Sequence, residues 1–107
     1  MLMLTKEIQR RLPKIGATDG LPAAQRKIIV KFFSIASQHR FYILEGRKLD
    51  DGDWELYGYT TVGSDGEYEY SLLSELTKVR WRGIPAIERD IHYGDHTLQE
   101  VLDGNTY

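Results

Sequence analysis

Three polar residues late in the chain, Glu88, Asp90 and His92, alternate with apolar or basic neighbours. If residues 87–93 form a β-strand, as their composition predicts, these three side chains share one face. Two carboxyl groups and an imidazole can exchange protons with a substrate, so one hypothesis is a small enzyme. The same pattern is typical of the solvent-exposed face of an edge strand. No nucleophile elbow, phosphate-binding glycine loop or zinc-protease motif accompanies it, and we assign no catalytic residue.

Histidines near the same segment could bind a metal ion, because imidazole is the commonest metal ligand. His92 and His96 flank Asp95, but no helical turn unites the two imidazoles, and a third ligand would have to come from His39 or a distant carboxylate. The Asp-Asp-Gly-Asp run at 50–53 lacks the alternating acids and the final glutamate of a calcium loop. The chain has no cysteine, which excludes thiolate ligands. We predict no metal and no cofactor.

A further group of residues combines aromatic rings with positive charge. Arg80 and Arg82 flank Trp81, and Tyr57 and Tyr59 are predicted to point outward from one strand. Trp, Tyr and Arg contribute most of the binding energy at many protein interfaces, which favours a protein partner. Aromatic and arginine side chains also stack on bases, so single-stranded nucleic acid is the alternative partner. The structural alternative is that Trp81 packs beneath its loop while the basic groups stay in solvent.

Arg89 is expected to face the protein core. The alternation of its predicted strand places it with Ile87 and Ile91, opposite the acidic residues. A guanidinium cannot lose its proton and must find acceptors. We therefore predict that Arg89 is at least half buried and paired, with Glu45, Glu75 or free carbonyls at a helix end as anchors. The alternative is that Arg89 lines a pocket and receives an anionic ligand.

Hydrophobic periodicity and turn residues predict the elements that carry these side chains. The expected strands span residues 27–33, 39 or 40 to 45, 54–62, 67–70 and 87–93, and the expected helices span 5–12, 71–79 and a short segment from 97. Thr5 and Ser71 are predicted N-caps, Pro13 ends the first helix, and residues 80–85 are expected to be a loop. This order predicts one α+β domain over residues 1–107: a mainly antiparallel four- to five-stranded sheet with two or three short helices on one face.

The turn before Glu67 decides which side chains share a face of the sheet, because a shift of one residue reverses them all. A two-residue Asp65-Gly66 turn would mix Leu56 and Val62 with glutamates. A three-residue turn at 64–66 gives a cleaner division. It places Trp54, Leu56, Val62, Tyr68 and Tyr70 on one face, and Glu55, Tyr57, Tyr59, Glu67 and Glu69 on the other. We therefore predict the three-residue turn.

Composition restricts the setting and the partners. The net charge of −2 argues against a duplex-binding domain, which usually has a basic excess, and against a strongly acidic DNA mimic. No apolar run approaches the about 20 residues that a membrane helix needs. Glu7 comes too early for a signal peptide, and the absence of cysteine fits a reducing compartment. We expect a cytoplasmic monomer or small homo-oligomer without membrane association.

Several segments, taken in order, resemble the DUF2958 family, a family of bacterial proteins without a known function. They are Leu4-Thr5-Lys6-Glu7 leading to Leu12-Pro13 and Gly16-Ala17-Thr18, then Val30-Lys31-Phe32-Phe33, Ser74-Glu75-Leu76 followed by Val79-Arg80, and Ile87-Glu88-Arg89-Asp90. The chain departs from the family in its short region 46–53 and in Ala86, which are differences within loops. The resemblance implies a protein of plasmids, phages or integrated conjugative elements, with an accessory role in transfer or in evasion of host defence. It supplies no catalytic residue, and we expect a non-enzymatic protein-binding module.

Overall fold

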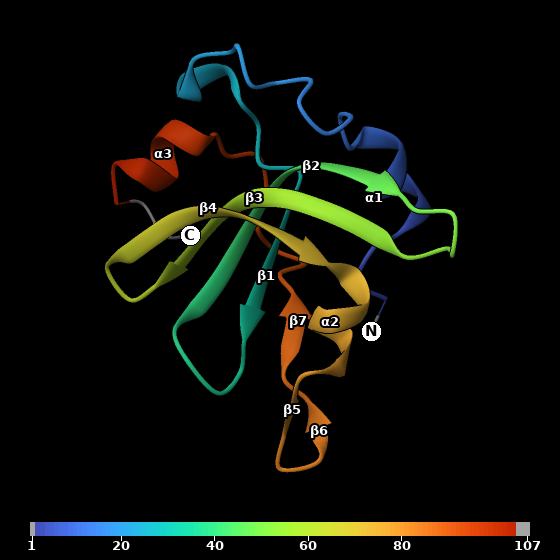
Figure 1. The fold of residues 1–107 in the computed structure, drawn as a ribbon. Helices are drawn as coiled ribbons and strands as arrows, with labels where there is room; N and C mark the ends of the chain where they lie inside the picture. Colours follow the sequence, from blue (N-terminus) through green and yellow to red (C-terminus); the bar gives the residue numbers. More distant parts are fainter. Residues whose placement is uncertain (1, 105–107) are drawn as a thin grey trace.

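The computed structural model describes residues 2–104, in which five strands form one antiparallel sheet (Figure 1). The strands lie in the order β4-β3-β2-β1-β7. Their bounds are Val30–Ser34 (β1), His39–Lys48 (β2), Trp54–Val62 (β3), Asp65–Leu72 (β4) and Ile87–Arg89 (β7). Successive hairpins connect β1 to β4, and β7 pairs with the other side of β1. The strands β4 and β7 are therefore the two edges of the sheet.

Three short α-helices, one 3-10 turn and a small hairpin accompany the sheet within the described residues. They are α1 (Lys6–Arg11), α2 (Leu73–Lys78), α3 (Leu98–Leu102), a 3-10 turn at Ala23–Gln25, and the hairpin of β5 (Arg80–Trp81) and β6 (Ile84–Pro85). The predicted α+β class with a mainly antiparallel sheet is confirmed. None of the helices in this part of the chain has the length and apolar character needed to cross a membrane.

The first helix begins and ends as the sequence predicts. The Thr5 Oγ1 atom accepts a hydrogen bond of 3.2 Å from the Ile8 N–H, one of the backbone donors that a helix leaves free in its first turn. The helix stops before Leu12 and Pro13, because proline disfavours helical geometry at the residue that precedes it. Leu4 and Ile8 are buried against the sheet, so the short helix is held by its packing.

Helices cover both faces of the sheet, which corrects the prediction that they lie on one face. Phe41 and Ile43 of β2 belong to the core beneath α1 and α2, on what we call the α1/α2 face. Tyr42 and Leu44 point to the opposite side, the α3 face, and pack with Leu98 of α3. Because β2 is apolar at each of these four successive positions, both of its faces need a cover.

The turn between β3 and β4 contradicts the predicted three-residue turn at 64–66. The pairing also differs from the rejected Asp65-Gly66 turn, although that alternative gave the observed faces. Val62 pairs with Asp65, so the turn is the two-residue Gly63-Ser64, and Gly63 supplies the positive φ of 63° that such a turn favours. Relative to β3, Tyr68 and Tyr70 therefore lie on the face opposite to the predicted one. The prediction failed because Asp65-Gly66 is the stronger turn signal in isolation, although Gly-Ser is also a recognised turn pair.

Residues 90–93 do not continue the predicted fifth strand, and β7 ends at Arg89. The Asp90 Oδ1 atom accepts a hydrogen bond of 3.0 Å from the His92 N–H, and this local turn competes with strand pairing. Ile91 is consequently 62% exposed, whereas the prediction placed it in the core. Strand β1 likewise starts at Val30 and not at residue 27.

The start of α2 also differs from the prediction. Ser71 belongs to β4, and a residue from the loop before β3 caps the start of the helix. Asp53 Oδ1 accepts from the Ser74 N–H at 3.0 Å, and Asp53 Oδ2 accepts from the Ser74 hydroxyl at 2.6 Å. The expected loop at residues 80–85 forms the β5–β6 hairpin, with positive φ at both Arg82 and Gly83.

Candidate functional site

Four tyrosines form a continuous aromatic cluster on the α3 face of β3 and β4, which we call the tyrosine surface: Tyr57, Tyr59, Tyr68 and Tyr70. The ladder places Tyr59 opposite Tyr68 and Tyr57 opposite Tyr70. The Tyr57 ring centroid lies 4.7 Å from that of Tyr70 and 6.3 Å from that of Tyr68, and the Tyr59 and Tyr68 centroids are 5.1 Å apart. Tyr68 and Tyr70 are 46% and 60% exposed. Aromatic pairs at these separations attract one another, so each ring holds its neighbours in place.

A shallow groove of about 640 Å³ extends the tyrosine surface beyond Tyr70. It is lined by Lys14 and Ile15 from the loop after α1 and by Arg47 and Glu55 from β2 and β3. The Arg47 Nε atom lies 2.8 Å from the Glu55 Oε1 atom, so this arginine is neutralised by a neighbour. The groove therefore combines apolar contact area with the positive charge of Lys14 and the paired charges of Arg47 and Glu55.

A buried carboxylate fixes the loop that borders this groove. Glu45 is fully buried, and its Oε1 atom accepts from the Gly16 N–H at 2.8 Å while Oε2 accepts from the Thr18 N–H at 2.9 Å. The Thr18 hydroxyl also donates to Oε2, and the Arg26 Nη2 atom lies 3.3 Å from it. Burial alone would raise the pKa of Glu45, but these donors and the Arg26 charge outweigh it and lower the pKa below 4.5.

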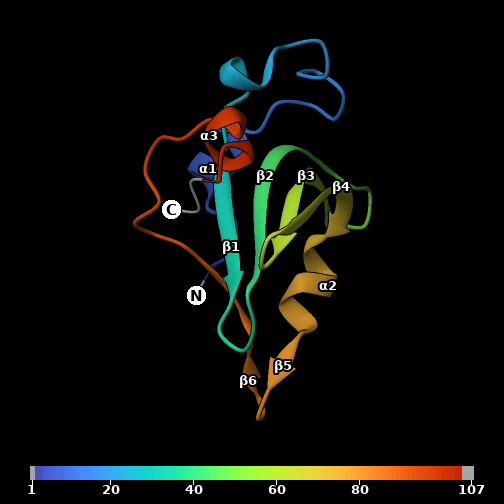
Figure 2. The same cartoon turned by 90° about the vertical axis from the view of Figure 1, so that its left-hand side faces the viewer.

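The other half of the predicted binding group lies on a separate element. Arg80, Trp81 and Arg82 form the β5–β6 hairpin, which projects away from the sheet below α2 (Figure 2). Trp81 is 41% exposed, and the Arg82 guanidinium lies 4.7 Å from its ring centroid. Arg80 donates to the Thr77 carbonyl at 2.6 Å and so binds the end of α2. The structure thus divides the predicted group into the tyrosine surface and this hairpin.

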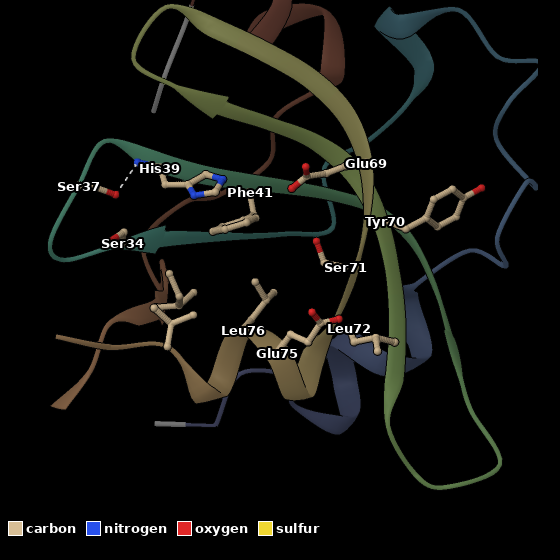
Figure 3. Close-up of a pocket in the computed structure, with 12 residues that line it drawn as sticks. Ser34, Ser37, His39, Phe41, Glu69, Tyr70, Ser71, Leu72, Glu75 and Leu76 are labelled. Carbon is tan, nitrogen blue, oxygen red and sulfur yellow. Dashed lines mark hydrogen bonds between the residues drawn. The ribbon is translucent and has the colours of Figure 1, made fainter. Parts of the chain in front are cut away.

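A second groove, of about 440 Å³, lies on the α1/α2 face between the sheet and α2 (Figure 3). His39 stacks on Phe41 with 4.2 Å between ring centroids. Glu69 of β4 points into the groove toward this pair, Glu75 of α2 lies at its border, and Tyr70 points the opposite way (Figure 3). The groove therefore has an aromatic and aliphatic floor with two carboxylates at its margin.

Arg89 is more than half buried on the α1/α2 face, as predicted, and pairs with Phe32 in the β1–β7 ladder. The predicted anchors are wrong, because Glu45 binds Arg26 and Glu75 lines the groove beside α2. The Nε atom of Arg89 is buried without a hydrogen-bond partner, and the guanidinium forms no ion pair with residues 2–104. The anionic ligand stays a prediction.

The three residues of the enzyme hypothesis are not brought together. Asp90 Oδ2 lies 3.5 Å from the Lys31 Nζ atom, His92 is exposed in the turn that follows, and Glu88 lies on β7. The groove that includes Asp90 is lined by neither Glu88 nor His92. Across the described part of the chain, no three His, Cys, Asp or Glu side chains are arranged to hold a metal ion. His96 instead bonds Glu100 at 2.7 Å.

Sequence reasoning identified half of the tyrosine surface and missed Tyr68 and Tyr70. Their spacing equals that of Tyr57 and Tyr59, so a correct turn would have brought the two pairs together. Comparisons with family models, curated proteins and solved structures gave no match to this chain. The fold and site define a small α+β sheet protein with an exposed aromatic face, and the DUF2958 resemblance stays a prediction.

Proposed function

We propose that this chain is a non-enzymatic protein-binding module that contacts its partner through the tyrosine surface. The observation that carries the proposal is the set of tyrosine rings in mutual contact, of which the two exposed ones lie on the edge strand β4. Tyrosine supplies a large amphipathic contact area and has few rotatable bonds to immobilise. Rings that already hold one another lose still less freedom on binding, so the surface is pre-organised for a protein interface.

Single-stranded nucleic acid is the alternative partner, because tyrosine rings also stack on bases. Such binding needs a positive field along the phosphate backbone. Near the rings, Arg47 is paired with Glu55, so Lys14 is the main cation of the adjoining groove. Strand β4 has no basic residue and carries Asp65, Glu67 and Glu69 on its other face. These charges favour a protein partner.

The resemblance to DUF2958 supports a setting for this module. Proteins of that family are often encoded on bacterial mobile elements. We therefore propose that the chain has an accessory role in transfer of such an element or in evasion of host defence. In either role the expected partner is a bacterial host protein or another protein of the element.

Affinity purification from bacterial cells that express the tagged chain tests the proposal. The wild type is compared with a Tyr57→Ser/Tyr70→Ser variant and, as a matched control, with a Trp81→Ala/Arg82→Ala variant of the hairpin. We expect one or a few proteins to be retained by the wild type and the hairpin variant and lost by the tyrosine variant. Identical proteins bound by all three chains, or none above background for the wild type, would contradict the proposal.

A further inference from the structure

We propose that β4 receives an extended, basic segment of the partner as a sixth, antiparallel strand of the sheet. The inference rests on the proposed function and deepens it by naming the chemistry of the partner. The partner segment would carry Lys or Arg at alternate positions and apolar side chains between them. Its backbone would bond to the free edge of β4, and its apolar residues would lie beside the tyrosine surface.

The register of the β3–β4 ladder shows which backbone groups of β4 are free. The two-residue turn makes Val62 and Asp65 a pair that exchanges both hydrogen bonds, and bonded pairs alternate along an antiparallel ladder. Glu67 and Glu69 therefore also direct their N–H and C=O groups to β3. By the same alternation, Gly66, Tyr68 and Tyr70 direct theirs to the open edge, where no other strand of residues 2–104 pairs with β4.

This edge has only one of the features that usually prevent strand addition. Natural edge strands are protected by charged side chains, proline, bulges or short length, and of these β4 has only its three carboxylates, which repel an acidic or identical strand and attract a basic one. Strand β4 spans eight residues without lysine or proline, and its pairing with β3 has no bulge. By contrast, β7 at the other edge has three residues. Strand β4 is thus a long open edge, whereas β7 is a short one that offers few backbone groups to an added strand.

The side chains of β4 specify the partner. Asp65, Glu67 and Glu69 point to the α1/α2 face, and Tyr68 and Tyr70 point to the α3 face. On the acidic side, Glu69 borders two grooves, the one beside α2 and a smaller one of about 300 Å³ that also includes His39. An added strand would send alternate side chains over these grooves, so Lys or Arg there meets carboxylates.

The same charges disfavour a second copy of this chain as the occupant. Two β4 strands in antiparallel pairing would bring their acidic faces together, with glutamates close to glutamates across the new ladder. Like charges at cross-strand positions destabilise a pair of strands. A basic segment removes this repulsion, which is why the partner is inferred to be a different chain.

The test uses fluorescein-labelled peptides of eight residues and measures their anisotropy with the whole chain. The parent probe alternates lysine and valine, and a block control has four lysines followed by four valines. Two further probes carry a methyl group on backbone nitrogen atoms, one probe at every valine and the other at every lysine. In the proposed arrangement valine lies opposite Tyr68 and Tyr70, so the valine N–H groups bond to β4 and the lysine N–H groups point away.

We expect the parent probe and the lysine-methylated probe to bind alike, and the valine-methylated and block probes to bind at least about tenfold more weakly. A Glu67→Gln/Glu69→Gln chain should bind the parent probe more weakly and with less dependence on salt. Equal affinities of the two methylated probes, or equal binding of the block probe, would overturn strand addition. Absence of binding by the parent probe would overturn strand addition as well. The proposed function would still hold in that case if the captured protein is lost only when the tyrosines are replaced.

Discussion

Strands β2 and β4 belong to the same sheet and have opposite environments. From Phe41 to Gly46 every residue of β2 is buried, because helices cover both of its faces. In β4, by contrast, no residue is fully buried and one edge is open. Stability is thus concentrated in the middle of the sheet, while the strand that is free to bind contributes little to the core. Changes in β2 and its direct partners should unfold the protein, and changes in β4 should affect binding.

The largest expected effect on folding comes from the buried charge in β2. Glu45→Gln removes a carboxylate that accepts bonds from the loop after α1, and it leaves the buried Arg26 guanidinium with only the exposed Asp19 carboxylate, 3.6 Å away, as a counter-charge. Removing one member of a buried ion pair leaves the other charge poorly compensated and costs about 3–5 kcal/mol of unfolding free energy. Urea unfolding at neutral pH should therefore show a loss of this size, and a loss below about 1 kcal/mol would show that the loop is not held by Glu45.

The pH dependence of the same pair sharpens this prediction. The pKa of Glu45 is lowered from 4.5 on folding, so its contribution is complete above its unfolded pKa and is lost as the pH falls through the folded pKa. The difference in unfolding free energy between wild type and Glu45→Gln should be constant near neutral pH and shrink below about pH 4.5. A difference that stays constant down to the acid limit would contradict the lowered pKa.

Two glycines of the β3–β4 hairpin provide a matched pair. A Cβ atom on Gly58 would lie 2.1 Å from the Tyr42 carbonyl oxygen of β2, whereas one on Gly66 would meet the Tyr59 hydroxyl at 2.2 Å. The β2 backbone is fixed between two strands and cannot move aside, whereas the Tyr59 hydroxyl is the end of a side chain that can shift at the cost of its packing with Tyr68. Gly58→Ala should cost about 1–3 kcal/mol or more, and Gly66→Ala clearly less. Thermal unfolding of the two variants measures this, and equal melting temperatures would contradict the assigned register.

Arg89→Met is expected to have the smallest effect on stability. A paired, buried arginine would predict a large loss, but the guanidinium forms no ion pair with residues 2–104, and its Nε atom is buried without a partner. Replacing an unsatisfied donor by an apolar group of similar length is close to neutral. The melting temperature should change by a few degrees at most, and a large fall would show that Arg89 has a structural partner.

Local patterns predicted most of the fold. The Thr5 cap, the Pro13 stop and the run of β-branched and aromatic residues in β3 each act through neighbouring residues, and each was predicted correctly. The turn at 63–64 and the end of β7 were mispredicted because two local turn patterns competed with the predicted ones, and the other errors arose where distant residues decide. Asp53 bonds the start of α2 from across the sequence, and the apolar Tyr42 and Leu44 require α3 on the second face.

The candidate site was predicted in part for the same reason. Residue type predicted Tyr57 and Tyr59 as outward-facing aromatic residues. The structure places them together on one face, but both are only partly exposed, and Tyr59 packs against the core beneath α3. Whether Tyr68 and Tyr70 join them depends on the strand register, and two adjacent glycine turns competed to set it. The grouping with Trp81 failed because α2 separates the hairpin from the sheet in the chain order.

Amide hydrogen exchange of the chain, alone and bound to the protein that it captures, tests the central claim most directly. Alone, the edge amides of Gly66, Tyr68 and Tyr70 should exchange quickly, while those of Glu67 and Glu69, bonded to β3, should be protected. In the complex, the three edge amides should become protected and the amides of β2 should change little. Protection that appears at the β5–β6 hairpin, with the edge of β4 still exchanging freely, would contradict the account.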